Sequence, residues 1–439
     1  MQMHENNITE QEALYELPEG WKWTRLGDCS SVISKGTTPK GGKDAYLKEG
    51  VNFLRIENLN ENGSINLSNI SHISIEEHEG NLKRSILEEG DLLISIAGTL
   101  GKVGFITKAD LPMNTNQAIA FVRLHKDIFD NKYLKYAIEN PFVNAELLAK
   151  TKVTSIPNLT LEIISNCLIP LPPTLAEQQR IVNRIETIFA KLDEAKEKAQ
   201  NVVDSFETRK AAILHKAFTG ELTANWRKEN GISDDSWEEK RLEDVCDFIT
   251  KGTTPKKEDM SIGNGDIPYI KVYNLCFDTK LDFTIDPTFV KLESHKNFLA
   301  RSITLPGDVL MNIVGPPFGK VSIVPDSYPE WNINQAIARF RCKSELYNVY
   351  LANYLISSKT IENMSRQIKT TAGQQNLTLE ICRNMTILVP SLPEQQEIVR
   401  ILDIVLEKES RAKEAAQTVL NQIALLKKSI LARAFRGEL

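Results

Sequence analysis

The chain has 439 residues, of which 41% are hydrophobic and 25% charged, and its formal net charge at pH 7 is -5. These values predict an ordinary soluble protein of two or more domains. No apolar run approaches the length of a membrane span, and the start MQMHENNITEQE lacks a signal peptide's basic and apolar regions, so we expect a cytoplasmic location. The six cysteines include no CxxC pair, which excludes the usual zinc and disulfide patterns and predicts buried free thiols.

The sequence is an internal repeat. KGTTPK stands at 35–40 and again at 251–256, and its neighbours repeat in the same order. The longer blocks are NQAIA at 116–120 and 334–338, NLTLEI at 158–163 and 376–381, EQQ-x-IV at 177–182 and 394–399, and AILHKAFTGEL at 212–222 against SILARAFRGEL at 429–439. A period this long indicates two copies of one structural unit.

In chain order, an N-terminal segment (1–20) precedes a first globular domain at 21–174. Within this domain, short apolar runs alternate with Gly, Asn and Asp turns, and one stretch near 131–149 has a helical pattern. The runs are VNFLRI, DLLISI, KVGFI and AIAFVRL. The pattern predicts an α+β domain, and residues 237–391 repeat it as a second domain.

Each globular domain is followed by a long helix, at 175–222 and 392–439, and a polar linker at 223–236 connects the first helix to the second domain. Apolar residues follow one another at steps of four and three, as in a coiled-coil seam. The seams are Ile181, Ile185, Ile188, Leu192, Ala195, Ala199, Val202, Phe206, Ile213, Ala217 and Ile398, Leu402, Val405, Ala412, Ala416, Val419, Ile423, Leu426, Ile430, with Glu409 out of pattern.

Two long helices with matching seams should pack on each other, forming a rod of roughly 60–70 Å. The alternative is that each helix packs on its own globular domain. Equivalent units usually associate about a twofold axis, which makes the paired helices antiparallel. We then expect the C-terminus to lie near the segment before Trp21, with residues 1–20 partly taking the place of the linker.

Catalytic motifs are missing. GTLGKV (98–103) and GPPFGKV (315–321) lack the spacing of a phosphate loop, so we interpret their glycines as turns, with Lys102 and Lys320 as candidate phosphate-facing residues. The first domain's histidines have no repeat partner by our alignment and no ligand spacing, so we expect surface roles for His72, His78 and His125. We therefore expect neither a catalytic residue nor a metal site.

Two similar domains held apart by helices suggest duplex DNA as the ligand, because its strands offer half-sites related by a twofold axis. Charge supports this only weakly, since acidic and basic residues nearly balance in each domain. A protein that binds DNA alone usually has a basic excess. Either DNA is not the ligand, or other subunits supply most phosphate contacts.

The doubled order of Trp-x3-Arg-Leu, KGTTPK, Gly-Asp (90–91 and 307–308), NQAIA, NLTLEI and EQQ-x-IV resembles the specificity subunit of Type I restriction-modification systems. The resemblance implies two target recognition domains, each for one half of a bipartite site, spaced by an antiparallel coiled coil. It implies as partners double-stranded DNA, two modification subunits and restriction subunits. This chain would be non-catalytic and hold no cofactor, with S-adenosylmethionine, ATP and Mg on the partner subunits.

The two domains differ most at 40–90 and 256–307, and different loops on one scaffold indicate different half-sites. Lys and Arg can bind guanine or phosphate and Asn can bind adenine. Our candidate DNA-binding residues are Lys40, Lys43, Arg55, Asn58 and Lys102 in the first domain, and Lys256, Lys257, Lys271, Tyr273, Asn274 and Lys320 in the second.

The repeated pairs Asn116-Gln117, Asn334-Gln335, Thr37-Thr38 and Thr253-Thr254 occur in both domains, so we assign them turn capping, backbone contact or subunit docking rather than base discrimination. Two other classes stay open. A stand-alone bipartite DNA-binding repressor should bind its site tightly without partners. A coiled-coil scaffold with two protein-binding domains should show no dependence on DNA.

Overall fold

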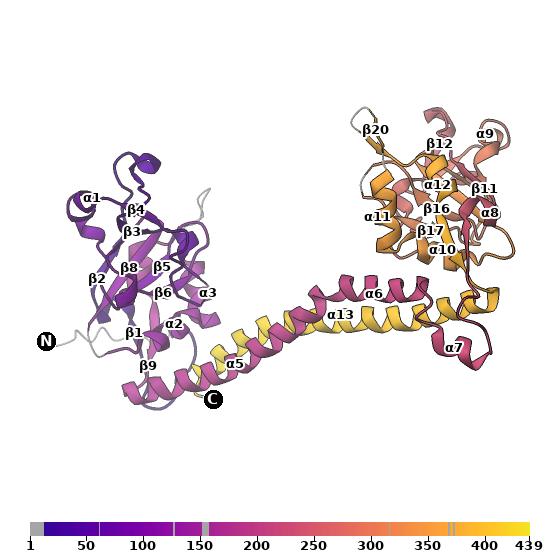
Figure 1. Ribbon diagram of the computed structural model, residues 1–439. Coiled ribbons are helices and arrows are strands. Elements are labelled where there is room, and N and C mark those ends of the chain that lie inside the picture. Colours follow the sequence, from indigo (N-terminus) through magenta and orange to yellow (C-terminus); the bar gives the residue numbers. More distant parts are fainter. Residues whose placement is uncertain are drawn as a thin grey trace. The chain divides into compact units, whose positions relative to one another are not determined.

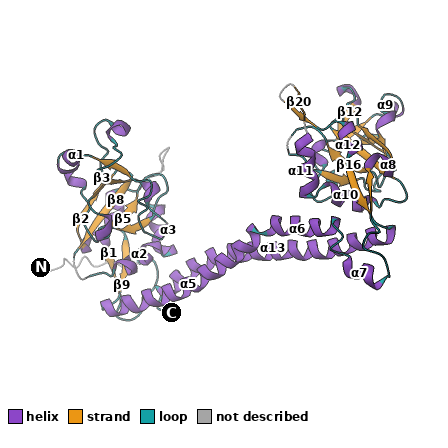
Figure 2. Ribbon diagram, in the orientation of Figure 1, coloured by secondary structure: helices purple, strands orange, loops and turns teal. Residues whose placement is uncertain are grey.

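The computed structural model describes residues 13–60, 62–125, 128–151, 158–315, 317–367, 369–371 and 374–439, and among these it describes no side chain at 43, 369–371 or 374–375. The chain forms two compact units, Met1–Gln200 with Thr418–Leu439, and Asn201–Gln417. Each unit contains one globular domain and part of two long helices (Figures 1 and 2).

The first domain has two small sheets and a separate strand pair. Its strands β2, β8, β5 and β6 form an antiparallel sheet in that order, and β4-β3-β7 form a second sheet in which β3 and β7 are parallel. Strands β1 and β9 pair with each other. Their bounds are β1 Lys22–Arg25, β2 Ser30–Lys35, β3 Val51–Leu54, β4 Ser71–Ile73, β5 Leu92–Ser95, β6 Val103–Phe105, β7 Met113–Thr115, β8 Ile119–Leu124 and β9 Leu168–Leu171.

The second domain repeats this topology in the order β11-β19-β16-β17, β12-β14-β13-β18-β15 and β10-β22, with a hairpin β20-β21. Both main sheets have a register shift in the first strand pair, at Ser30/Val32 and at Cys246/Phe248. The bounds are β10 Glu238–Arg241, β11 Cys246–Lys251, β12 Met260–Ile262, β13 Ile267–Ile270, β14 Thr288–Val290, β15 Ile303–Thr304, β16 Val309–Asn312, β17 Val321–Ile323, β18 Trp331–Ile333, β19 Ile337–Cys342, β20 Lys369–Thr371, β21 Gln374–Asn376 and β22 Thr386–Val389.

The main sheet of the first domain is buried on both faces. Leu92 and Ile94 of β5 pack with the helices, whereas Leu93 between them packs toward the second sheet with Leu54 and Phe121. Side chains alternate across a strand, so a strand covered on both faces needs a continuous apolar run. This is why DLLISI contains no hydrophobic alternation, and the predicted strands and α+β class are confirmed.

The predicted helix near 131–149 is two helices, α2 (Asn131–Glu139) and α3 (Pro141–Ala149). Asp130 caps the first by accepting from the Tyr133 backbone N–H at 2.9 Å. The break follows from Pro141, because proline disfavours helical geometry in the residue before it and fits the first position of a helix. The other short helices are α1 Ile75–Glu79, α4 Leu161–Ser165, α8 Leu242–Val245, α9 Leu292–Lys296, α10 Asn348–Leu355, α11 Ser358–Gln367 and α12 Leu379–Asn384.

The long helices are α5 (Leu175–Asp204), α6 (Phe206–Phe218) and α13 (Leu392–Ala434), so the predicted central helix is interrupted at Ser205. In the first unit, Lys427 Nζ lies 2.6 Å from Asp193 Oδ1, and Arg180 donates to the Leu439 carbonyl. In the second unit, the ion pairs are Glu207 with Lys413 and Arg209 with Glu409. Within each unit, the residue numbers of one helix increase along the pair while those of its partner decrease. The two helices therefore run antiparallel, which confirms the prediction.

Fewer of the predicted seam residues are buried than the seven-residue repeat predicted. Ala199, Ala416 and Ile423 are buried, but Ala195, Ala412, Val419 and Leu426 are exposed, with Leu426 at 47%. An α-helix has 3.6 residues per turn, so a strict seven-residue repeat drifts by about 20° per heptad away from the contact face of a straight helix. The prediction was wrong at these four positions for that reason.

The helix ends pack on the globular domains, so the alternative packing also occurs. Ile181 and Ile185 near the start of α5 join the core of the first domain together with Leu431 and Phe435 from the end of α13. The repeated EQQ motif fixes this contact: the buried Gln178 side chain donates to the Ile128 carbonyl at 3.0 Å and accepts from the Asp130 N–H at 2.8 Å. Gln395 makes the same two bonds in the second unit, to Glu345 and Tyr347.

The C-terminus lies beside the N-terminal segment, as predicted. Gly437 packs directly against Pro18, and Leu439 joins the core cluster that contains Leu14 and Trp21. The corresponding place in the second unit is taken by the linker, where residues 224–229 form helix α7 (Ala224–Glu229).

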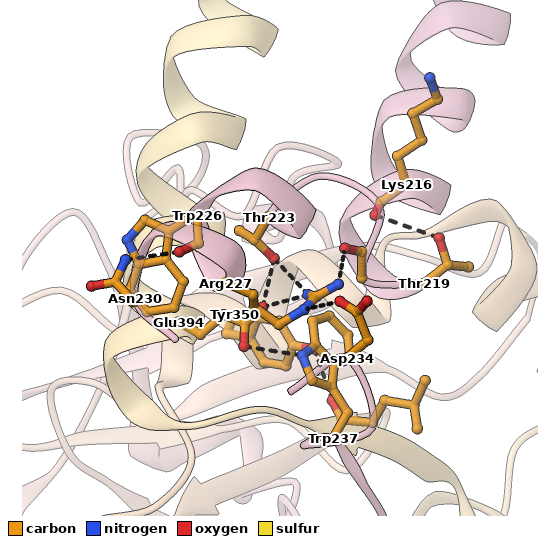
Figure 3. Close-up of polar contacts among 12 residues, drawn as sticks. Lys216, Thr219, Thr223, Trp226, Arg227, Asn230, Asp234, Trp237, Tyr350 and Glu394 are labelled. Atoms are coloured by element: carbon orange, nitrogen blue, oxygen red, sulfur yellow. Dashed lines mark hydrogen bonds and ion pairs between the residues drawn. The ribbon is translucent and has the colours of Figure 1, made fainter. Parts of the chain in front are cut away.

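The linker is anchored through a buried ion pair. Arg227 Nη1 donates to Glu394 Oε1 at 2.7 Å and Nη2 donates to the Gly220 carbonyl at 2.8 Å (Figure 3). Thr223 and the Trp237 indole also donate to the Glu394 carboxylate, at 2.6 and 3.1 Å. The polar composition of the linker therefore includes residues that fix it to the start of α13.

Candidate nucleic-acid interface

The repeated Gly-Asp at 90–91 and 307–308 ties two neighbouring strands of the main sheet together. Asp91 accepts two bonds from Arg123, Nε to Oδ1 at 2.9 Å and Nη2 to Oδ2 at 2.8 Å. Asp308 and Arg341 form the same bidentate pair, with both distances 2.7 Å. The aspartate hydrogen bonds raise the pKa of both arginines, and both carboxylates are buried. These pairs are scaffold rather than ligand contacts.

The two most repeated motifs, KGTTPK and NQAIA, fold against each other in both domains. The Thr37 N–H donates to the Thr115 carbonyl at 3.0 Å, and the Thr253 N–H donates to the Ile333 carbonyl at 3.1 Å. The glycine of KGTTPK is required because a Cβ on Gly36 or Gly252 would overlap these same carbonyl oxygens. Gln117 Oε1 accepts from Thr38 Oγ1, as Gln335 Oε1 accepts from Thr254 Oγ1.

The asparagines of NQAIA cap this turn. Asn116 Oδ1 accepts from the Ala118 N–H at 3.1 Å, and Asn334 Oδ1 accepts from the Ala336 N–H at 2.7 Å. Turn capping, one of the shared roles that we assigned to this motif, is therefore what the asparagines do. We call the surface formed by KGTTPK and NQAIA, together with Arg84 in the first domain or Arg301 in the second, the motif turn.

Each motif turn also holds an exposed arginine that our sequence argument missed. Arg84 Nε and Nη2 both donate to Thr37 Oγ1 at 3.2 Å, and Arg301 Nε donates to Thr253 Oγ1 at 3.0 Å. Both lie in the Arg-Ser step that precedes Gly-Asp in each copy, in LKRSILEEGD and LARSITLPGD. Aligning the repeats through the divergent segments would have found them.

The divergent segment of the first domain contains β3, a short 3-10 turn at Ile56–Asn58, β4 and α1. Asn58 is buried: its Oδ1 accepts from the Arg55 N–H at 3.1 Å and its Nδ2 donates to the Asn66 carbonyl at 3.3 Å. Asn274 does the same in the second domain, accepting from the Lys271 N–H at 2.9 Å. Their side chains close the turn and do not face solvent, so the structure contradicts our prediction that Asn58 and Asn274 bind bases.

The remaining candidates of the first domain lie around this turn or beside the motif turn. Arg55 is partly exposed, pairs with Glu57 at 3.0 Å and lies over the Tyr46 ring. Lys102 reaches the same turn, with its Nζ 3.4 Å from the Leu59 carbonyl. Lys40 is exposed. The side chain of Lys43 lies outside the described part of the chain.

In the second domain, Lys271 and Tyr273 lie together at the turn Val272–Asn274, with the ammonium 5.7 Å from the ring centre. Lys320 lies over Phe277, a few residues further along. Lys256 is exposed at the end of the motif turn and Lys257 directly after it, and Lys256 Nζ is 3.8 Å from Glu258. The structure thus brings the candidates together in two groups per domain, one at the short turn and one at the motif turn.

A buried arginine distinguishes the second domain. Arg339 in β19 occupies the position of Phe121 in β8, is 4% exposed and has no hydrogen-bond partner for its Nε. Its Nη2 donates to Thr250 Oγ1 at 3.0 Å and the guanidinium lies over Phe248. Burial lowers the pKa of Arg339 to about 10, which leaves it charged at neutral pH.

Our prediction for His78 needs correction, because it does have a repeat partner. His78 Nδ1 contacts Asn114 Oδ1, and His295 Nδ1 contacts Asn332 Oδ1 at 2.7 Å. Asn114 and Asn332 in turn donate to the Leu82 and Leu299 carbonyls, so each histidine belongs to a buried network rather than an isolated surface position. The low identity of the flanking residues hid the match.

Other site types find no support in the described part of the chain. No three His, Cys, Asp or Glu side chains there are placed to hold a metal ion. No helix among those residues is long and apolar enough to cross a membrane. All six cysteines are free; four are buried, as predicted, while Cys276 and Cys342 are half-buried.

The class of protein follows from this arrangement: a duplicated α+β scaffold that presents different polar loops at equivalent places and carries paired antiparallel helices. A family model, the Type I restriction modification DNA specificity domain, matches residues 18–204 and again 234–421. The chain belongs to this family.

The chain is similar to known specificity subunits over nearly its whole length. The chain is 26% identical to the Type I restriction enzyme MjaVIII specificity subunit of Methanocaldococcus jannaschii, covering 99% of this chain and 96% of that protein. It is 24% identical to the EcoBI specificity subunit of Escherichia coli, covering 95% and 86%. The fold resembles the HsdS subunit of Thermoanaerobacter tengcongensis, with a TM-score of 0.65 at 21% identity, covering 97% of this chain and 99% of the other.

Proposed function

We propose that this chain is the DNA specificity subunit of a Type I restriction-modification system. The observation that carries the proposal is the duplication of the specificity domain over both halves of the chain. Each copy holds a different loop surface on one scaffold, at 40–90 and 256–307. Two dissimilar domains of one family in one chain fit a bipartite, asymmetric DNA site, with one domain for each half.

The helices would set the distance between the half-sites. Helix α13 contributes residues to both compact units, and it pairs with α5 in one and α6 in the other. A helix rises by about 1.5 Å per residue, so its length defines a spacing.

The chain would act without catalysing a reaction itself. In this proposal two modification subunits carry S-adenosylmethionine and methylate adenine, and restriction subunits supply the ATP- and Mg-dependent steps in the cytoplasm. The balanced charge of the domains fits shared DNA binding, because partner subunits can supply phosphate contacts. One solved structure with the same fold, with a TM-score of 0.73, comes from work on complex assembly of the type I R-M system.

Methylome sequencing tests the proposal. Cells that express this chain with its modification subunits should carry methylated adenines in one bipartite motif, and cells that lack only this chain should carry none of them. Deleting one heptad from both α5 and α13 should shorten the unspecified spacer and leave both half-sites unchanged. A methylation pattern independent of this chain would reject the proposal. An unchanged spacer would reject the proposal that the helices set the distance between the half-sites.

A further inference from the structure

The motif turn is an exposed polar surface that the two domains share in sequence and geometry. Its threonine, glutamine and arginine make the same contacts in both copies, with Arg84 on Thr37 at 3.2 Å and Arg301 on Thr253 at 3.0 Å. Arg84, Gln117, Arg301 and Gln335 are all exposed. The adjacent divergent segments have different sequences, so selection for a particular base cannot explain this identity.

The chemistry of the motif turn is that of a donor surface. The Gln117 and Gln335 carbonyl oxygens each accept a threonine hydroxyl proton, and both residues are exposed, so their amide N–H groups are available to a ligand. Arg84 uses Nε and Nη2 on Thr37, and Arg301 uses Nε on Thr253, which leaves further guanidinium N–H groups at each site. A guanidinium has five N–H donors and no acceptor. The fitting ligand is an anion that only accepts.

The local charge is positive in both copies. Lys35 and Lys40 are the first and last residues of KGTTPK in the first motif turn, as Lys251 and Lys256 are in the second, and all four are exposed. Carboxylates also lie at both sites: Glu77 Oε1 accepts from the Lys40 N–H at 3.2 Å, Glu258 is 3.8 Å from Lys256 Nζ, and Asp259 pairs with Lys291 at 3.2 Å. With the arginine, basic side chains outnumber acidic ones at each site: Lys35, Lys40 and Arg84 against Glu77, and Lys251, Lys256, Lys257 and Arg301 against Glu258 and Asp259.

We infer that the two motif turns bind the phosphodiester backbone of DNA, one at each half-site, through Arg84 with Gln117 and Arg301 with Gln335. This inference rests on the proposed function. A phosphate is the acceptor-only group that is present at every half-site whatever its bases. The same turn can then serve two domains that recognise different sequences. Arg84 and Arg301 are thus positioned by threonine so that they anchor each domain on the duplex.

The test uses the assembled complex of this chain with its modification subunits and measures binding to the motif found by methylome sequencing and to an unrelated duplex. The variants are Arg84→Gln, Arg301→Gln and the charge-preserving Arg84→Lys, with Arg366→Gln as a control, since Arg366 is exposed on α11 and pairs only with Glu362 among the described contacts. Each Gln variant should lower the affinity of the complex for both duplexes by a similar factor. Each should also reduce the slope of log affinity against log salt by about 0.9. Arg84→Lys should keep the slope.

Three results would overturn the inference while leaving the proposed function intact: wild-type affinity and slope in both Gln variants, loss of affinity for the motif only, or loss of modification subunits from the complex at unchanged salt slope. The second result would indicate base contact and the third a protein-docking surface. Thermal unfolding of each variant shows whether the turn still folds, and a loss of slope in Arg84→Gln that Arg84→Lys restores cannot come from unfolding. A wild-type complex without preference for any motif would instead reject the proposed function.

Discussion

The first glutamate of the EQQ motif is buried in the second unit and partly exposed in the first. Glu394, the first residue of the second EQQ motif, is fully buried and accepts bonds from Arg227, Thr223 and Trp237. Glu177, its counterpart in the first motif, is partly exposed and pairs only with Arg180 on its own helix among the described contacts, which lowers its pKa.

The difference comes from what each repeat has next to the motif. In the second unit, the linker after Gly220 forms α7 and inserts Arg227 beside the start of α13. In the first unit, Gly437 and Leu439 lie at this place and pack on the N-terminal segment instead. A repeated motif therefore reports a shared scaffold, while its local energetics depend on segments outside the repeat.

The largest expected effect is the loss of the buried ion pair. Glu394→Ala removes the buried carboxylate from the Arg227 guanidinium and leaves it only the exposed Asp234, so the free energy of unfolding of the second unit should fall by about 3–5 kcal/mol. Glu177→Ala removes an exposed pair and should cost the first unit at most about 1 kcal/mol. Denaturant unfolding followed by hydrogen exchange at the start of α5 and of α13 measures both. Equal losses in the two units would contradict the comparison.

A smaller effect of opposite sign is expected at Arg339, where the first domain has Phe121. Arg339→Phe removes a buried charge with an unsatisfied Nε, so the second unit should gain about 1 kcal/mol of stability at pH 8. The pKa of Arg339 lies below its ordinary value when folded, so the folded state loses its proton first and the burial cost is relieved as pH rises through about 10. The stability gap between variant and wild type should therefore narrow from pH 8 to pH 11.

Two observations would contradict this account of Arg339. One is a destabilised Arg339→Phe variant, and the other is a gap that does not change with pH. Arg341→Phe is the matched control, because it breaks the pair with Asp308 and should destabilise the domain.

Sequence periodicity and repetition predicted the main features of the fold because these features follow from local rules. Three of the four apolar runs became strands of the main sheet and VNFLRI became β3 of the second sheet, while the seam became paired helices and the doubled motifs recur in both globular domains. The exposed Leu426 shows where the heptad rule fails, since a straight helix turns away from its partner over several heptads.

The candidate site was harder to predict, because side-chain burial in loops depends on residues far away in sequence. Asn58 and Asn274 have the composition of base-contacting residues, yet they close turns onto carbonyls 8 residues further along in both domains. Arg84 and Arg301 were missed because the alignment was anchored on long identities, which skip the short Arg-Ser match between divergent loops. Arg227 was hidden in a linker whose polar composition gave no sign of a buried partner.

The central claim is that each globular domain recognises its own half of a bipartite DNA site. Its most direct test replaces residues 237–391 with the second domain of a relative of known specificity and sequences the methylome with the same modification subunits. We predict that one half of the methylated motif changes to that of the relative while the other half and the spacer stay as in the wild type. A motif that changes in both halves, or in neither, would contradict the claim.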